Sequence, residues 1–274
     1  MKRLIIFFIT CFFFLIPTTT FSNHRKLEKR KIKQNANLQH YNLRNIDLRE
    51  ANLRNAMLDY SDLSGSNFKS ADLSGASLES SNLRYTNLKN ATLTNSNLKY
   101  SEIDSANLRN ANLSKANLEG SDLSFVDLSF ALIINANLNG SKLKNALLKN
   151  TNLRNAVLSN ANLQNSFFIN SDLRNVNFSN SNMEEANLKN SNLSGAKLVG
   201  TNLRSANLSG AKLVGSNFNS ANLTRVILNR ADLSNVDLSG ASLKNIQANN
   251  LMACPDSLPI GWICENNSLK QSLI

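Results

Sequence analysis

Bulky hydrophobic residues recur at every fifth position along most of this chain. The series begins at Leu38 and continues in one frame, without a shift, to Leu243. It contains 42 positions, of which 35 are Leu and the others Phe, Ile or Met. The residue two places earlier is usually Ala or Ser, the residue between is Asn or Asp in 29 of the 42 repeats, and the last two positions are mostly polar.

A period of five fits neither of the regular secondary structures. An α-helix repeats every 3.6 residues and a strand alternates every two, so either one would spread these leucines over opposite faces. The chain must instead turn once per repeat, so that each Leu returns to a shared interior. Asn, Asp, Ser and Gly at the remaining positions tolerate such turns. The pattern therefore predicts a solenoid of stacked repeats.

Individual repeats resemble a known family. Segments such as Ala51-Asn52-Leu53-Arg54-Asn55 and Ala71-Asp72-Leu73-Ser74-Gly75 are similar to the unit A-(D/N)-L-x-x of pentapeptide-repeat proteins. The resemblance covers residues 36–245 and implies an all-β fold, a right-handed quadrilateral β-helix with four repeats per coil and about ten coils in total. The same fold serves many roles, so the resemblance indicates architecture rather than function.

The amino-terminal segment has the pattern of a targeting sequence. Basic residues precede an apolar run from Leu4 to Ile16, and the small residues Thr20 and Ser22 follow. This predicts a secretory signal peptide at residues 1–22 and hence export to the periplasm or the medium. An uncleaved membrane anchor is the alternative, although the run is shorter than the about 20 residues that span a bilayer. Residues 23–35 are predicted to form a basic arm or cap.

The carboxyl-terminal segment, residues 246–274, departs from the repeat and is predicted to be a cap. We expect Leu258, Trp262 and Ile263 to cover the last layer of leucines. Two cysteines remain once Cys11 has left with the signal peptide, and in an oxidising compartment this count predicts a disulfide between Cys254 and Cys264. Free thiols are the alternative. A cysteine-bearing tail also resembles that of exported pentapeptide-repeat proteins.

The chain has a net charge of +11, so basic residues outnumber acidic ones on its surface. With four repeats per coil, side chains at equivalent positions of every fourth repeat should stack, and a column of basic residues then forms that Ser129 interrupts. We predict this column as a docking face for an anionic partner, with an ordinary solvated face as the alternative. Its members are Arg49, Lys69, Lys89, Arg109 and Lys149.

Three apolar residues occupy positions that are polar in most repeats. They are Leu147, Phe167 and Ile169, and the first two are one coil apart. Clustered exposed apolar groups mark interaction surfaces, so we predict a contact patch here. Drift of the repeat sequence is the alternative.

Residues for catalysis or metal binding are scarce. His24 and His40 are the only histidines, and both precede or begin the repeats. The acidic residues are scattered over turn positions, and no glycine-rich phosphate-binding motif is present. A rod with a filled interior offers no cleft around them. The sequence therefore predicts no enzymatic activity, no cofactor and no metal site.

These features predict a non-enzymatic exported solenoid that presents its faces to a protein or a cell-envelope component. Membrane contact is expected only through the signal peptide. Export and the lack of aromatic residues along the basic column argue against nucleic acid as a partner. The alternative is a topoisomerase-interacting DNA mimic, as some pentapeptide-repeat proteins are, but the basic charge and the export signal disfavour it. The sequence leaves the partner and the oligomeric state open.

Overall fold

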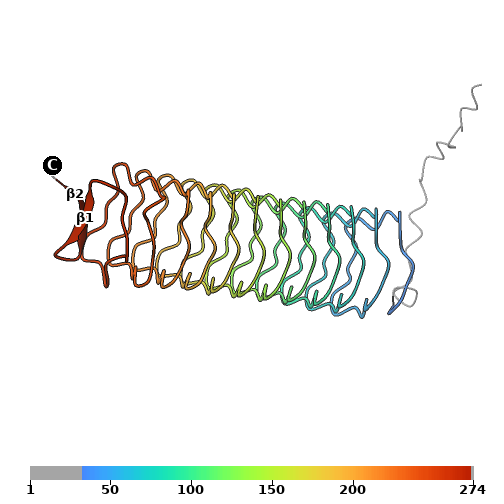
Figure 1. Cartoon of the computed structure of the whole chain (residues 1–274). Helices are drawn as coiled ribbons and strands as arrows, with labels where there is room; N and C mark the ends of the chain where they lie inside the picture. The colour runs from blue at the N-terminus through green and yellow to red at the C-terminus, as the bar shows by residue number, and fades with distance from the viewer. Residues whose placement is uncertain (1–32, 273–274) are drawn as a thin grey trace, which may run out of the picture.

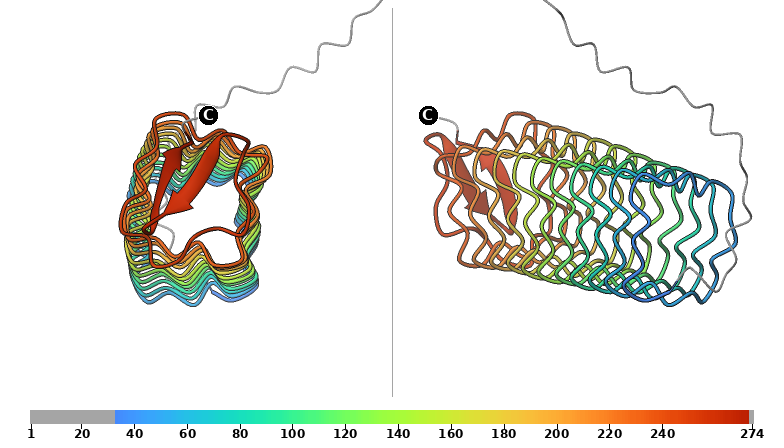
Figure 2. Two further views of the ribbon diagram at one scale, coloured as in Figure 1. Left: turned by 60° about the vertical axis from the view of Figure 1, so that its left-hand side comes forward. Right: turned by 90° about the vertical axis from the view of Figure 1, so that its right-hand side faces the viewer.

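The structure is a computed structural model that describes residues 33–272. In this part the chain winds in successive coils that stack into a long rod (Figure 1), and the outline seen nearly end-on is roughly four-sided (Figure 2). The predicted signal peptide, and the basic arm up to residue 32, lie outside the described residues. No helix among residues 33–272 is long and apolar enough to cross a membrane.

The length of one coil follows from the pairing between coils. Parallel bridges join the second residue of each repeat to the equivalent residue four repeats later along almost the whole rod, from Asn37 with Met57 to Asp237 with Ser257. Main-chain hydrogen bonds run in both directions between coils. For example, the Leu58 N–H donates to the Ser77 carbonyl at 2.7 Å, and the Met57 N–H donates to the Ala36 carbonyl at 2.9 Å. Each coil therefore holds four repeats and is bonded to both neighbours.

Four repeats per coil produce four faces along the rod. We number them by the first Leu of their inner columns: face 1 begins with Leu38, face 2 with Leu43, face 3 with Leu48 and face 4 with Leu53. Each corner is named by the two faces that it joins. A face carries the first three residues of each repeat, and a corner carries the last two, which form the turn.

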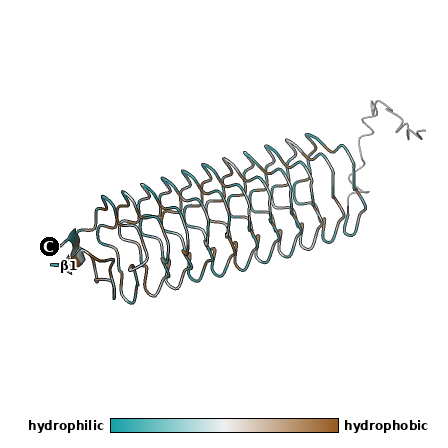
Figure 3. Cartoon of the chain, turned by 45° about the horizontal axis from the view of Figure 1, so that its top comes forward, coloured by the Kyte–Doolittle hydropathy of each residue, from teal (hydrophilic) through white to brown (hydrophobic). Residues whose placement is uncertain are grey.

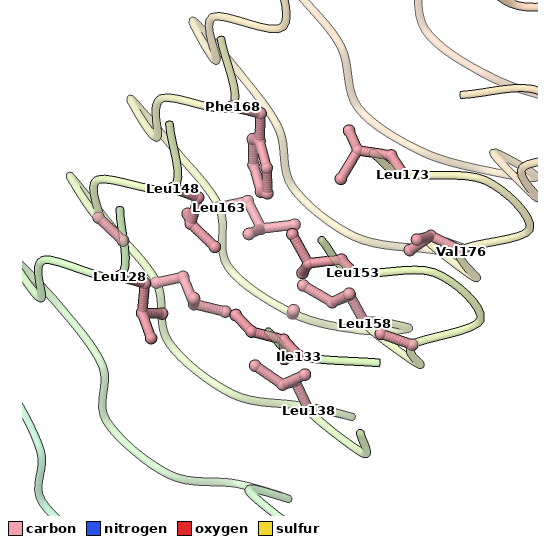
Figure 4. Close-up of a cluster of buried hydrophobic side chains, with 14 of the residues drawn as sticks. Leu128, Ile133, Leu138, Leu148, Leu153, Leu158, Leu163, Phe168, Leu173 and Val176 are labelled. Carbon is pink, nitrogen blue, oxygen red and sulfur yellow. The ribbon is translucent and has the colours of Figure 1, made fainter. Parts of the chain in front are cut away.

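The predicted inner positions form the core. All 42 are buried, and none is more than 4% exposed. Side chains from successive coils lie one behind another in the interior, as Leu128, Leu148 and Phe168 do in Figure 4. Hydrophobic residues recur in every coil of the rod (Figure 3). The prediction that the five-residue period marks the buried positions is confirmed.

The polar positions of the repeat satisfy the backbone. The Asn52 side-chain oxygen accepts a hydrogen bond from the Arg54 N–H at 3.3 Å, and Asp72 accepts one from the Ser74 N–H at 3.0 Å. Such bonds stabilise the turn. At most repeats where the small inner residue is Ser, its hydroxyl donates to the carbonyl three residues earlier, as Ser121 does at 2.6 Å. Ser66 and Ser171 donate instead to a carbonyl of the preceding coil, and the hydroxyl of Ser181 has no partner among the described residues. Most inner serines are therefore tolerated because the hydroxyl has a partner.

The last residue of each repeat takes a left-handed backbone conformation. Asn55 has φ 53° and Gly75 has φ 67°, and the same sign recurs at nearly every corner. Asn and Gly adopt this region at little cost, whereas other residues pay about 1–2 kcal/mol. The frequent Asn and Gly at this position follow from that requirement.

The winding continues beyond residue 245, where the five-residue pattern stops. Ala248 and Leu251 are buried, and Gln247 still pairs with Ile227. The chain then forms a hairpin in which β1 (Trp262–Glu265) pairs antiparallel with β2 (Ser268–Gln271) across the end of the rod (Figure 1). The Leu269 N–H donates to the Ala248 carbonyl at 3.0 Å, which attaches the hairpin to the last coil.

Two of the three residues predicted to cover the core do so. Leu258 and Trp262 pack against it, together with Cys264. Ile263 is 39% exposed. It points away because neighbouring residues of a strand face opposite sides, and Trp262 and Cys264 take the inner side. The predicted disulfide between Cys254 and Cys264 is present in the structure.

The core makes a first prediction. Leu148→Ala should lower the free energy of unfolding by about 2–5 kcal/mol, because it leaves a cavity between two coils. Lys149→Ala, at the adjacent exposed position, should change it by at most about 1 kcal/mol. Urea unfolding followed by circular dichroism measures both. Equal effects of the two substitutions would contradict the assignment of residue 148 to the interior.

A second prediction concerns the cap. The disulfide closes a loop whose ends are 10 residues apart, so the double variant Cys254→Ser/Cys264→Ser should destabilise the cap by about 2–3 kcal/mol. Since each coil contacts only its neighbours, the loss should be concentrated at that end of the rod. Trp262 fluorescence should therefore change at a lower urea concentration than circular dichroism. Coincident transitions, unchanged from the parent protein, would argue against this.

Candidate docking surface

The predicted basic column lies along corner 3/4, and its members differ in their surroundings. Arg49 forms an ion pair with Asp47 at 2.7 Å, and this hydrogen bond, with the nearby negative charge, raises the pKa of Arg49. Lys69, Lys89 and Lys149 form no ion pair with any residue between 33 and 272. These three lysines leave positive charge available along the corner.

The predicted apolar patch lies beside this column. Leu147 and Phe167 pair with each other on face 3, and Ile169 follows on corner 3/4. Phe167 is 37% exposed, while Leu147 and Ile169 are half-buried. The two sets, which the sequence presented as separate features, thus occupy a face and its adjoining corner.

Cation–π contacts join the two sets. The Lys149 Nζ lies 5.5 Å from the centre of the Phe167 ring, and the Arg109 guanidinium carbon lies 5.4 Å from that of Phe130. Contacts of this kind are worth about 0.5–1 kcal/mol at exposed sites. We call the combined area the basic–apolar surface, defined by six residues: Arg109, Phe130, Leu147, Lys149, Phe167 and Ile169.

Phe130 was missed in the sequence analysis. It is 47% exposed and takes φ 64° at a position where most repeats have Asn, Ser or Gly. A bulky aromatic residue at the last position of a repeat, where Asn, Ser or Gly is usual, can be recognised in the sequence and could have indicated this residue. It costs conformational energy and exposes apolar area, so stability of the isolated rod does not account for it.

An acidic residue borders the surface. Asp127 pairs with Leu147 along face 3 and accepts a hydrogen bond from Arg109 at 3.2 Å. Burial alone would raise the pKa of Asp127, but hydrogen bonds from the Ser129 side chain and N–H and from Arg109 bring the pKa below its ordinary value. Asp127 is therefore ionised at neutral pH and neutralises Arg109. The excess positive charge of the corner comes from its lysines.

One open hollow of the described rod, of about 590 Å³, lies beside the hairpin, and its lining includes Leu243, Ile246, Trp262, Lys244 and Lys270. No histidine, cysteine or carboxylate lines this hollow, so it lacks a pair of groups for acid–base chemistry. Within residues 33–272, no three His, Cys, Asp or Glu residues gather closely enough to hold a metal ion.

The pattern of repeats matches a known family model. The model for pentapeptide repeats matches in eight copies, at segments between residues 34 and 240. The chain belongs to the pentapeptide-repeat family. No curated protein sequence matches it.

Several solved pentapeptide-repeat structures are similar to this chain. HetL of the cyanobacterium Nostoc sp. strain PCC 7120, a protein involved in the regulation of heterocyst differentiation, is 30% identical over 78% of this chain and 88% of its own, with a TM-score of 0.28. A protein of the Arabidopsis thaliana thylakoid lumen is 32% identical over 31% of this chain and 59% of its own, with a TM-score of 0.30. The fluoroquinolone resistance protein QnrB1 is 18% identical over 67% of this chain and 83% of its own, with a TM-score of 0.41.

The carboxylates make a prediction about pH. Hydrogen bonds and neighbouring cations lower the folded-state pKa of Asp72, Asp122, Asp127 and Asp172. Because the folded-state pKa is the lower one, ionised Asp stabilises the fold at every pH above the unfolded-state pKa of about 3.9. This contribution is lost as the pH falls through the folded-state pKa. The urea concentration at the unfolding midpoint should therefore decrease when the pH is lowered below about 4. The double variant Asp127→Asn/Asp172→Asn should lose less stability on acidification than the parent protein. An equal loss in both proteins would refute the conclusion that these two carboxylates have lowered pKa values in the folded state.

Proposed function

We propose that this protein is a non-enzymatic, exported binding scaffold that docks through its basic–apolar surface on an anionic protein or cell-envelope component. The observation that carries the proposal is the pair of cation–π contacts, Arg109 with Phe130 and Lys149 with Phe167. They place cations and half-exposed rings together on one side of a rod whose interior is filled. Function is then expected on the outside.

The two kinds of residue contribute differently to docking. Unpaired lysines along corner 3/4 attract an anionic partner over several ångströms and speed the encounter. The exposed rings of Phe130 and Phe167 supply apolar area that a partner can bury. Their present exposure is unfavourable, and burial in a complex would remove that cost.

Export is supported from both ends of the chain. The basic start, short apolar run and small residues of positions 1–22 have the order of a secretory signal peptide. The Cys254–Cys264 disulfide fits an oxidising compartment, where such bonds form and persist.

We also propose that the stacked coils are the right-handed quadrilateral β-helix of the pentapeptide-repeat family. The register of the bridges, which pair every repeat with the fourth one after it, and the roughly four-sided outline support this architecture. An acidic DNA mimic that binds a topoisomerase receives no such support, because the chain carries a net charge of +11.

The docking proposal predicts a loss of binding on charge reversal. The triple variant Lys69→Glu/Lys89→Glu/Lys149→Glu should sediment with isolated cell envelopes at least about tenfold less than the parent protein, since each basic residue near an anionic surface is worth about 1 kcal/mol. The matched control is Lys197→Glu/Lys212→Glu/Lys244→Glu, which changes the net charge equally but away from corner 3/4. It should retain most of the binding.

Two results would count against the proposal. Equal losses in both triple variants would show that net charge alone drives the binding. Residence of the protein in the cytosol of fractionated cells would remove the envelope as its partner.

A further inference from the structure

A second set of exposed aromatic residues alternates between the two edges of face 2. Tyr60 and Tyr100 lie on corner 1/2, and Tyr85 and Phe125 lie on corner 2/3. Their exposed fractions are 55%, 54%, 66% and 62%, respectively. Since one coil takes four repeats, they come from four successive coils and change edge at every coil. We call these four residues the aromatic row.

The edge opposite each ring carries a small residue. In the coil of Tyr60 the opposite corner position is Gly65, and in the coil of Phe125 it is Gly120. The middle two coils have Ser80 and Ser105 at these positions. Each ring therefore stands across face 2 from a position that has no large side chain of its own.

The aromatic row is unfavourable for the rod alone. All four residues have left-handed backbones, with φ between 56° and 59°. Bulky residues pay about 1–2 kcal/mol for this conformation, whereas Asn, the usual residue at other corners, pays little. The row also exposes apolar area to water. Neither stability nor solubility explains it, whereas a ligand that covers the rings would.

Neighbouring residues hold two of the rings in place. The ring of Tyr60 is stacked on that of His40, with centroids 5.1 Å apart and planes within 5°. The ring of Tyr100 has the Lys99 ammonium 4.9 Å from its centre, and it lies so close to Gly120 that a Cβ there would be 2.6 Å from two ring carbons. Rings that are already ordered lose little freedom on binding.

The carboxylates of face 2 are paired, and the edges around the aromatic row add more acidic than basic residues, among them Asp59, Glu79 and Glu119. On face 2, Asp62, Glu102 and Asp122 point outward between the rings, and each forms an ion pair with a basic residue. The partners are Arg44 at 3.7 Å, Arg84 at 3.5 Å and Lys142 at 3.4 Å. Paired carboxylates and cations do not require a charged ligand. They offer hydrogen-bond acceptors and donors side by side, which suits a neutral ligand rich in hydroxyl groups.

The spacing of the rings discriminates between linear polymers. Coils stack about 4.8 Å apart, so the positions that bear the rings recur about every 9.6 Å on the same edge and change side once per coil. In an extended peptide, side chains on the same side recur about every 6.8 Å, which is shorter than the spacing of about 9.6 Å along one edge of face 2. A polyproline helix has three residues per turn and lacks the two-sided alternation. In an extended glycan with equatorial linkages, the length of each sugar is close to the spacing between coils. Each sugar is also flipped relative to the one before it, so equivalent apolar sugar faces point alternately to the two sides.

We propose that face 2, between Tyr60 and Phe125, binds a neutral, extended glycan chain with equatorial linkages along the axis of the rod. The rings of the aromatic row stack on alternate sugars, and the paired charges of face 2 bind their hydroxyl groups. The site goes beyond the docking function proposed above: it lies on a different surface and does not require corner 3/4.

The test is calorimetric titration of the full chain with two neutral oligosaccharides that have equatorial linkages, hexa-N-acetylchitohexaose and cellohexaose. We expect binding of at least one of them, and the double variant Tyr85→Asn/Phe125→Asn should weaken it at least about tenfold, because two stacking rings are removed. The same variant should melt at an equal or higher temperature than the parent protein, since Asn relieves the left-handed strain. Loss of binding would then not be attributable to loss of fold.

Matched controls separate this site from the basic–apolar surface. Phe130→Asn/Phe167→Asn removes the same number of exposed rings elsewhere and should leave glycan binding unchanged. Maltohexaose, whose axial linkages curve the chain, and decaproline should bind at least about tenfold more weakly than the better of the two ligands. The proposal is overturned if neither equatorial glycan binds, if decaproline binds as well or better, or if the control variant loses as much affinity as the variant of the aromatic row.

Discussion

The hydrogen bonds between successive coils are the constraint on which the rest of this structure depends. A single coil has no interior of its own, because its leucines can be buried only against the leucines of the next coil. Main-chain bonds such as that from the Leu53 N–H to the Asp72 carbonyl, at 2.7 Å, hold successive coils in register. Once this register is set, every inner side chain lies beside its equivalents, and every outer side chain belongs to a column along the rod.

The interior of the described rod is filled and nearly uniform. All 42 inner positions are buried, and 35 of them are Leu. The corners vary much more. Because the last residue of each repeat must adopt a left-handed conformation, Asn and Gly are the inexpensive choices there, and any large side chain has a cost. Both surfaces discussed above use such costly residues, Phe130 on one and the aromatic row on the other.

The two ends of the rod pose a different problem. The last layer of leucines has no further coil to cover it, and a hairpin with the single Trp of the chain takes that place. Hydrogen bonds from the hairpin to the last coil and the disulfide between Cys254 and Cys264 join the cap to the rod. A terminal unit of this kind is needed because stacked repeats otherwise leave apolar surface exposed at their ends.

The sequence by itself determined the buried positions and the turns, because a strict period of five permits one frame. It also indicated the disulfide, because Cys254 and Cys264 both lie in the short segment that follows the repeats. It also indicated the basic column, once the resemblance to pentapeptide-repeat proteins supplied the coil of four repeats. Only the tertiary structure decided that Arg109, Phe130, Lys149 and Phe167 belong to one surface, that Ile263 faces outward and that the winding continues past Asn245. The reason is physical: the period sets where a residue sits on the coil, but side-chain partners come from neighbouring coils and from the strand pairing of the cap, which no local pattern encodes.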